Sequence, residues 1–201
     1  MRGEEEAPEG IRERVLGICE RYIPHGMIAE LGCGYGHFSR IASKIGFKTI
    51  GVEINTRKIN KRIQPIIRAN LNNTLPLKNG VFECLVAIEV IEHLENPWYF
   101  LREIKRILKN NGIAIFTFPN FTDFTSRIRF FFKTEFSFFI KKIPEDGHIS
   151  LITYWLFKFM AKKEDFKRLN SIWSLTSGWN LVLYRKRKNK CGVDSTPLHR
   201  T

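Results

Sequence analysis

Three glycines at alternate positions follow an apolar run near the start of the chain, and they restrict the fold more than any other feature. Residues 28–36 read Ile-Ala-Glu-Leu-Gly-Cys-Gly-Tyr-Gly, and a second apolar run ends on Glu53. Glycines let a backbone turn sharply out of a strand and approach a ligand closely, and a carboxylate at the tip of the next strand can accept hydrogen bonds from both ribose hydroxyls. The pattern predicts a βαβ unit that binds a cofactor with a nucleoside part.

Two other nucleotide-binding motifs fit these residues less well. A dinucleotide fingerprint has glycine or alanine three residues after its second glycine, so that the helix packs tightly on the strand. This chain has His37 at that position. The Gly-Lys-Ser/Thr of a phosphate-binding loop is also missing from the sequence. The remaining alternative is an ordinary strand-to-helix turn in some other α/β protein.

Apolar runs alternate with amphipathic stretches along most of the chain, which is the pattern of a doubly wound α/β sheet. Asn111-Gly112 is the expected stop of the helix before the fifth strand. Two later runs predict an antiparallel hairpin. We expect strands at 27–31, 48–53, 66–69, 82–88, 113–118, 167–173 and 179–186, and helices at 10–23, 36–46, 56–63, 97–109 and 150–163.

The composition is that of one globular domain. The chain has 201 residues, 43% of them hydrophobic, which suffices for one sizeable core. Because neither a run of about 18 apolar residues nor an apolar signal segment is visible, we expect a cytoplasmic protein. The four cysteines lack metal-site or disulfide spacing, so we expect reduced thiols. We place a single domain at 1–186 and a basic, flexible tail at 187–201.

The segment 82–120 adds a family resemblance to the glycine motif. It begins Phe-Glu-Cys-Leu-Val-Ala-Ile-Glu-Val-Ile-Glu-His and ends Ile-Ala-Ile-Phe-Thr-Phe-Pro-Asn. With the glycine motif and Glu30 before it, this segment resembles the class I S-adenosylmethionine-dependent methyltransferases, in the branch of ubiquinone-biosynthesis O-methyltransferases and "type 11" enzymes. The resemblance extends in order from about residue 26 to 166. It implies a seven-stranded, mostly parallel Rossmann-like sheet with an antiparallel C-terminal strand and an insertion or lid at about 119–148.

Ligands of such sheets bind outside the carboxyl ends of the parallel strands. The resemblance implies that Glu30 and the glycine loop face the methionyl part of S-adenosylmethionine, Glu53 its ribose and Asn70-Leu71 its adenine. Many relatives have aspartate at the position of Asn70, but an amide oxygen still accepts a hydrogen bond from the exocyclic amine. The expected cofactor residues are Glu30, Gly32, Cys33, Gly34, Gly36, Glu53, Asn70, Leu71 and Glu89.

The segment Glu89-Val-Ile-Glu92-His93 is where chemistry on the methyl acceptor is expected. Methyl transfer from a sulfonium needs mainly alignment, but a neutral hydroxyl acceptor must also lose its proton. In one interpretation His93 is the general base, with Glu92 as its neighbour in the catalytic pair. In a second, the cluster is only a hydrogen-bonded helix start. In a third, Glu89, Glu92, His93 and His148 bind manganese, iron or zinc, which lowers the pKa of the hydroxyl.

The metal interpretation has a resemblance of its own. Small-RNA 3′-end 2′-O-methyltransferases have a Glu-x-x-Glu-His group and another histidine several dozen residues later, and here His148 follows His93 by fifty-five residues. Metal-assisted 2′-O-methylation of RNA is therefore an alternative to the main expectation, which is O-methylation of a hydroxyl on a small molecule. A non-catalytic S-adenosylmethionine-binding subunit of a modification complex is a further alternative.

A phenylalanine-rich segment lies in the expected insertion. Residues 116–139 hold ten of the seventeen phenylalanines, interleaved with Arg127, Arg129 and Lys133. Aromatics at such mixed spacing usually complete a core under an insertion. The other options are a membrane contact, a base-stacking platform and a pocket for an apolar acceptor. Such a pocket would be lined by Phe121, Phe124, Phe130, Phe131, Phe132 and Phe136.

The charge of the chain does not choose between these options. The formal net charge is +13, and residues 155–201 carry eleven Lys and Arg against three acidic residues. RNA, anionic lipid and acidic metabolites all favour a basic surface. The basic run at 185–190 is of the kind that usually forms a solvated face.

Overall fold

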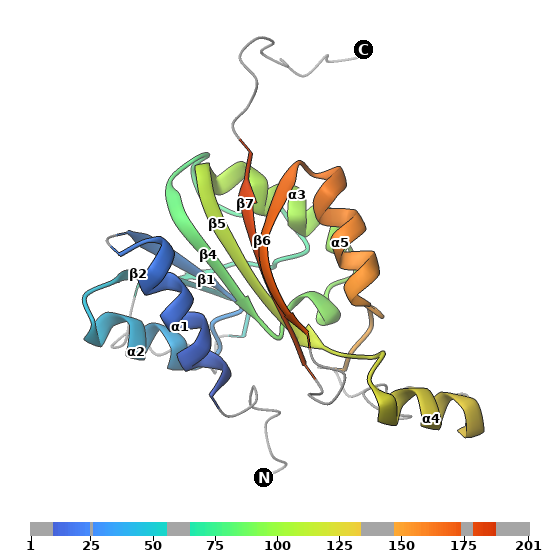
Figure 1. Cartoon of the computed structure of the whole chain (residues 1–201). Helices are drawn as coiled ribbons and strands as arrows, with labels where there is room; N and C mark the ends of the chain where they lie inside the picture. Colours follow the sequence, from blue (N-terminus) through green and yellow to red (C-terminus); the bar gives the residue numbers. More distant parts are fainter. Residues whose placement is uncertain (1–9, 25, 56–64, 134–146, 174–178, 188–201) are drawn as a thin grey trace, which may run out of the picture.

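A seven-stranded sheet forms the centre of the computed structural model, which describes residues 10–24, 26–55, 65–133, 147–173 and 179–187. The strand order is β3-β2-β1-β4-β5-β7-β6 (Figure 1). Neighbouring strands are parallel except for β7, which is antiparallel to both β5 and β6. This confirms the expected doubly wound α/β sheet. The strands are β1 Met27–Leu31, β2 Lys48–Glu53, β3 Ile66–Arg68, β4 Phe82–Ile88, β5 Leu108–Pro119, β6 Phe166–Trp173 and β7 Trp179–Lys186.

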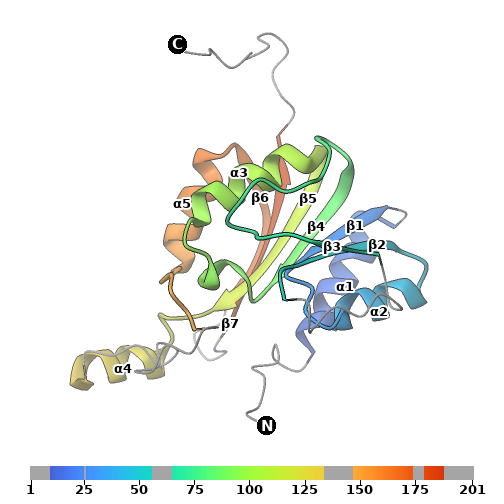
Figure 2. The same cartoon turned by 180° about the vertical axis from the view of Figure 1, so that it is seen from behind.

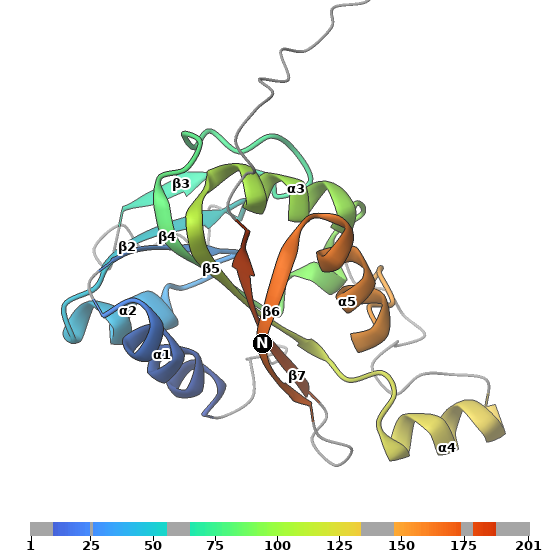
Figure 3. The ribbon, with the colours of Figure 1, turned by 45° about the horizontal axis from the view of Figure 1, so that its top comes forward.

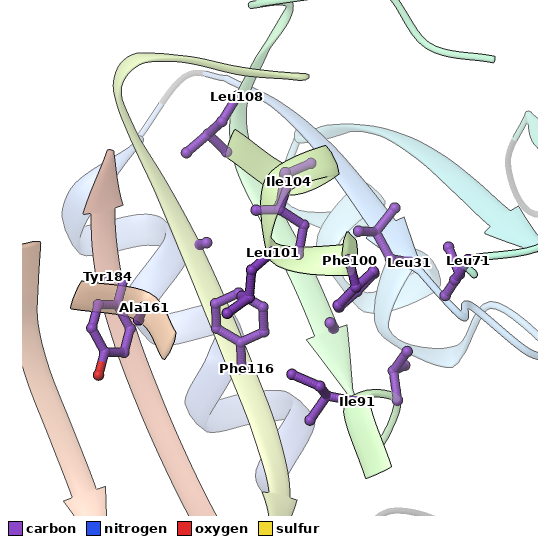
Figure 4. Packing of buried hydrophobic residues seen from close by; sticks show 14 of the residues in the cluster. Leu31, Leu71, Ile91, Phe100, Leu101, Ile104, Leu108, Phe116, Ala161 and Tyr184 are labelled. Atoms are coloured by element: carbon purple, nitrogen blue, oxygen red, sulfur yellow. The ribbon is translucent and has the colours of Figure 1, made fainter. Parts of the chain in front are cut away.

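Helices cover both faces of the sheet, with α1 and α2 on one face and α3 and α5 on the other (Figures 1 and 2). Each pair buries apolar side chains against the strands, as Phe38 does from α2 and Phe157 from α5. Figure 4 shows the apolar cluster on the face covered by α3 and α5, where Leu101 and Ile104 of α3 lie near Phe116 of β5. The helices are α1 Ile11–Tyr22, α2 His37–Lys44, the 3-10 turn η1 Ile91–His93, α3 Pro97–Ile107, α4 Phe124–Lys133 and α5 Tyr154–Lys163.

The start of β5 differs from the expectation. Helix α3 ends at Ile107, and the strand begins at once with Leu108, which is fully buried and pairs with β4. Residues 109–112 then bulge out of the ladder, and Asn111 has a φ of 65° there. The expectation that Asn111-Gly112 stops the helix is therefore wrong. Asn111 and Gly112 instead lie in a bulge inside the strand. Leu108, which precedes this bulge, is buried and stays paired in the sheet.

The expected insertion at 119–148 contains the unpredicted helix α4, which extends away from the sheet (Figures 1 and 3). Asp123 caps it, since its Oδ1 accepts a hydrogen bond from Ser126 N at 2.7 Å. Among the described phenylalanines of 116–139, the interpretation as core holds for the buried Phe116, Phe118 and Phe121. It is wrong for the exposed Phe124, Phe130, Phe131 and Phe132. Phe136, the expected helix at 56–63 and the tail beyond residue 187 lie outside the described residues.

The connection from β3 to β4 carries the predicted adenine-binding residues, and hydrogen bonds to an ion pair within α3 fasten it to that helix. Arg106 Nη2 lies 2.7 Å from Glu103 Oε2, and the same guanidinium donates to the carbonyl oxygens of Leu75 and Leu77. Burial alone would raise the pKa of Glu103, but hydrogen bonds from Arg106 and from the N–H of Leu75 outweigh burial and lower it. Glu103 and Arg106 both bind backbone groups of the β3–β4 connection, so the ion pair holds this connection in place. Removing either side chain would also leave the other charge unpaired.

Candidate active site

The glycine loop joins β1 to α2 and is hydrogen-bonded to the end of β2. The N–H groups of Gly32 and Cys33 both donate to Val52 O, at 2.8 and 3.1 Å. Gly36 N donates to Cys33 O at 2.8 Å, which closes a tight turn before the helix. Cys33 itself is buried. The loop that was expected to approach the cofactor is thus held firmly at the carboxyl edge of the parallel strands.

Two of the glycines have different surroundings. Gly32 and Gly34 both have positive φ, 68° and 50°. A Cβ on Gly32 would lie 2.7 Å from Cγ2 of Val90, so a larger residue would force the loop and the β4–η1 connection apart. A Cβ on Gly34 would meet no atom within 4 Å. Open space therefore borders the loop at Gly34, where a ligand can approach the backbone.

We expect Gly34→Ala to weaken binding of S-adenosylhomocysteine about tenfold, because the new methyl group would occupy that open space. Gly80→Ala is the matched control. Gly80 also has a positive φ, 62°, and a Cβ there would likewise meet no atom within 4 Å, so both variants carry a similar backbone strain. Titration calorimetry would compare the two affinities, and equal values would contradict the assignment of this loop.

Two buried carboxylates hold the loop and the helix behind it. Glu53 Oε2 accepts a hydrogen bond from Gly34 N at 2.8 Å, and its Oε1 accepts one from Asn55 N at 2.8 Å. A carboxylate has about four acceptor positions, so ribose hydroxyls can bind the same group. Glu30 Oε2 accepts from the N–H of Ser39 at 3.2 Å and also from its hydroxyl. Glu30 thereby stabilises the start of α2, a role that the sequence did not reveal.

Asn70 and Leu71 follow β3 at the same edge of the sheet. Asn70 Oδ1 accepts a hydrogen bond from Asn72 N at 2.9 Å, which forms a local turn. Its second lone pair can still accept from an adenine amine, so that contact stays a prediction. Leu71 is buried in the core cluster on the α3 side. Asn72 Oδ1 accepts from Glu95 N at 2.9 Å, which joins this loop to the chain before α3.

Glu89 follows directly after β4 and has a strained conformation. Its φ is 55°, which is uncommon for a residue other than glycine and tends to occur at functional sites. Its N–H donates to Thr117 Oγ1 at 3.1 Å, and the Thr117 hydroxyl donates to Glu89 Oε1 at 2.6 Å. The carboxylate is therefore held beside β5. Sequence reasoning missed Thr117, although a threonine within the apolar strand residues 113–118 was a visible signal.

Backbone hydrogen bonds bring the segment 147–150 onto η1. The N–H groups of Ile149 and Ser150 both donate to Glu92 O at 2.9 Å. The Ser150 hydroxyl donates to Leu94 O at 2.6 Å. These contacts explain why α5 begins at Tyr154, later than expected. The N–H groups of Ile149 and Ser150 are already hydrogen-bonded to η1, so these residues do not join the helix.

His93 and His148 meet as a result. Their ring centroids lie 4.8 Å apart in an edge-to-face arrangement, and His148 also contacts the ring of Phe121. His93 Nδ1 lies 3.3 Å from Gly147 O. A carbonyl can only accept, so Nδ1 is the donor, and the neutral ring then has its lone pair on Nε2. This tautomer is the one that a general base acting through Nε2 requires.

The same residues form a group that could hold a metal ion. One ligand atom from each of Glu92, His93 and His148 lies within 4.8 Å of the others. Tetrahedral ligands about 2.1 Å from an ion lie about 3.4 Å apart, so the three atoms would need to close by up to about 1.4 Å to bind one ion. One carboxylate and two imidazoles suit zinc, manganese or iron. Glu89, the fourth residue of the predicted set, is not part of this group, because its carboxylate is engaged by Thr117.

The chain is similar to known methyltransferases. Residues 29–116 match the methyltransferase domain family. A probable S-adenosylmethionine-dependent methyltransferase of Mycobacterium tuberculosis is 29% identical over 46% of this chain and 35% of the relative. A ubiquinone biosynthesis O-methyltransferase of Caulobacter vibrioides is 26% identical over 43% of this chain and 38% of the relative. The chain spans about a third to a half of the length of the curated relatives it matches.

The fold agrees with these matches. A crystal structure of a Thermotoga maritima S-adenosylmethionine-dependent methyltransferase, described as a possible histamine N-methyltransferase, superposes with a TM-score of 0.66. It is 20% identical, and the match covers 88% of this chain and 89% of that structure. The glycine loop lies within the segment that matches the methyltransferase domain family, and the sheet of the chain has the fold of the solved S-adenosylmethionine-dependent methyltransferases.

Proposed function

We propose that the protein transfers a methyl group from S-adenosylmethionine to a hydroxyl of a small molecule, with His93 as the general base. The observation that carries the proposal is the orientation of His93, whose Nδ1 donates to Gly147 O and so leaves Nε2 as the basic atom. The relative from Caulobacter, an O-methyltransferase by name, supports an oxygen acceptor. The buried Phe121 beside His148 supports an acceptor with an apolar part.

Each group of residues has one task in this proposal. S-adenosylmethionine, when bound, supplies an electrophilic methyl group. The glycine loop and Glu53 would hold its nucleoside and methionyl parts, and Asn70-Leu71 would contact its adenine. His93 would remove the acceptor's hydroxyl proton at Nε2, so that the oxygen becomes nucleophilic as the methyl group is transferred. Glu92, which is fully buried next to His93, would stabilise the imidazolium that forms.

A second candidate function is metal-assisted 2′-O-methylation of RNA. The observation that favours it is the convergence of Glu92, His93 and His148, which suits a transition metal. A bound divalent ion would lower the pKa of a ribose hydroxyl, and the +13 net charge suits a polyanionic substrate. In this candidate His93 is a ligand and not a base.

One experiment separates the two. The purified protein is incubated with methyl-labelled S-adenosylmethionine and a cell extract, with and without a chelator, and label is followed into RNA, small molecules and lipids. We expect label in the small-molecule or lipid fraction whether or not chelator is present. Chelator-sensitive label in RNA would replace this proposal by the second candidate. Label in no fraction, with cofactor binding intact, would contradict both.

A further inference from the structure

An exposed apolar stripe runs along α4. Phe124, Ile128, Phe131 and Phe132 are all solvent-exposed, and the fractions for the three phenylalanines are 69%, 81% and 76%. At about 100° per residue, these four positions fall within a stripe about 100° wide on one side of the helix. A single exposed apolar residue is ordinary, but a continuous stripe marks a surface for another partner.

The charge on this helix is of one sign. The ten residues of α4 include three basic residues and no acidic one, and the exposed Arg127 lies next to Ile128. An apolar stripe with basic residues on the same helix is the pattern of a helix that lies in the interface of an anionic membrane. A second copy of this chain fits less well, because the basic helices would face each other on molecules of net charge +13.

The outer face of α5 also exposes apolar side chains. Trp155 is 71% exposed and stacks on Phe159, with ring centroids 5.8 Å apart. Lys158 and Lys162 are exposed on the same helix. In all three views the first turn of α5 lies on the side of the molecule from which α4 extends (Figures 1, 2 and 3). Tryptophan is enriched at membrane interfaces, where its ring is apolar and its N–H can contact polar groups.

We propose that α4 and the first turns of α5 form a docking surface for an anionic lipid bilayer. Phenylalanine side chains would enter the boundary between headgroups and acyl chains, and the basic residues would contact lipid phosphates. No helix in the described part of the chain is long and apolar enough to cross a membrane, so the contact would be peripheral. Because α4 starts shortly after β5 ends at the candidate site, an acceptor dissolved in the bilayer would be near His93, a consequence that rests on the proposed function.

The docking surface is tested by sedimentation of the full chain with vesicles, which needs no catalytic activity. We expect binding to vesicles of phosphatidylcholine mixed with phosphatidylglycerol, weak binding to phosphatidylcholine alone, and loss of binding at high salt. Phe131→Ser and Trp155→Ser should each weaken binding about tenfold. Ile45→Ser, at a 48% exposed position after α2, is the matched control and should bind as the parent does. Since these positions are exposed, the variants should keep the parent's thermal unfolding midpoint.

Three results would overturn the proposal. The first is that none of the vesicles binds the chain, or that Ile45→Ser weakens binding as much as Phe131→Ser. The second is binding of single-stranded RNA that depends on Phe131 in the absence of vesicle binding, which would make α4 a base-stacking surface. The third is self-association that Phe131→Ser abolishes, again without vesicle binding, which sedimentation equilibrium would detect.

Discussion

His93→Gln should lower the rate of methyl transfer about a hundredfold or more and leave the affinity for S-adenosylhomocysteine near that of the parent protein. Removal of a positioned general base typically costs a factor of about 10² to 10⁴. Glutamine has a similar size and its amide can still donate to Gly147 O, so the local structure should persist. Label transfer into the accepting fraction gives the rate, and calorimetry gives the affinity. Full turnover in this variant would remove His93 from the mechanism.

His148→Gln distinguishes a base from a metal ligand. If His93 acts as a base, His148→Gln should retain most of the activity, because His148 contacts the ring of His93 and does not itself take the proton. If the cluster binds a metal, substitution of His93, His148 or Glu92 should abolish activity to a similar extent, since each supplies one ligand. A chelator would then inhibit the parent, and added zinc or manganese would restore it. Metal content of the purified protein is a readout independent of turnover.

Glu53→Ala should weaken binding of S-adenosylhomocysteine by about 2 kcal/mol, roughly thirtyfold, because hydrogen bonds to a charged group are lost. Glu53 also accepts from Gly34 N, so the variant could loosen the glycine loop as well. A 2′-deoxy analogue of the ligand separates these effects. If Glu53 binds the ribose, the parent prefers the ribose form and the variant loses that preference. Equal weakening toward both ligands would mean that Glu53 supports only the loop.

Glu95→Ala is the matched control for the Glu53 experiment. Glu95 is exposed and lies before α3, and its N–H, not its carboxylate, makes the contact with Asn72. Glu95→Ala should therefore bind both ligands with the affinity of the parent. A loss of affinity in Glu95→Ala would show that net charge, not a specific contact at Glu53, controls binding.

Local chemistry accounts for the parts of the fold that were predicted well. The strand, glycine loop and helix around residues 27–44 depend on apolar periodicity and on positions where only glycine tolerates a positive φ, and both are visible in neighbouring residues. At 109–112 the local pattern predicts a helix stop where the structure has a bulge, because the decisive fact is burial of Leu108 against another strand. The same holds for α4: the mixed spacing of its apolar residues predicts core, but the tertiary structure leaves them exposed.

The sequence by itself determined the resemblance to S-adenosylmethionine-dependent methyltransferases, the succession of the seven strands along the chain, and the carboxyl-edge positions of the glycine loop and Glu53. These follow from patterns within a few residues and from a topology that the family resemblance implies. Only the tertiary structure decided that His148 lies against His93, that Glu89 pairs with Thr117 instead of joining the histidines, and that the α4 phenylalanines face solvent. Those facts depend on contacts between residues far apart in the chain, and no local pattern encodes the distances between them.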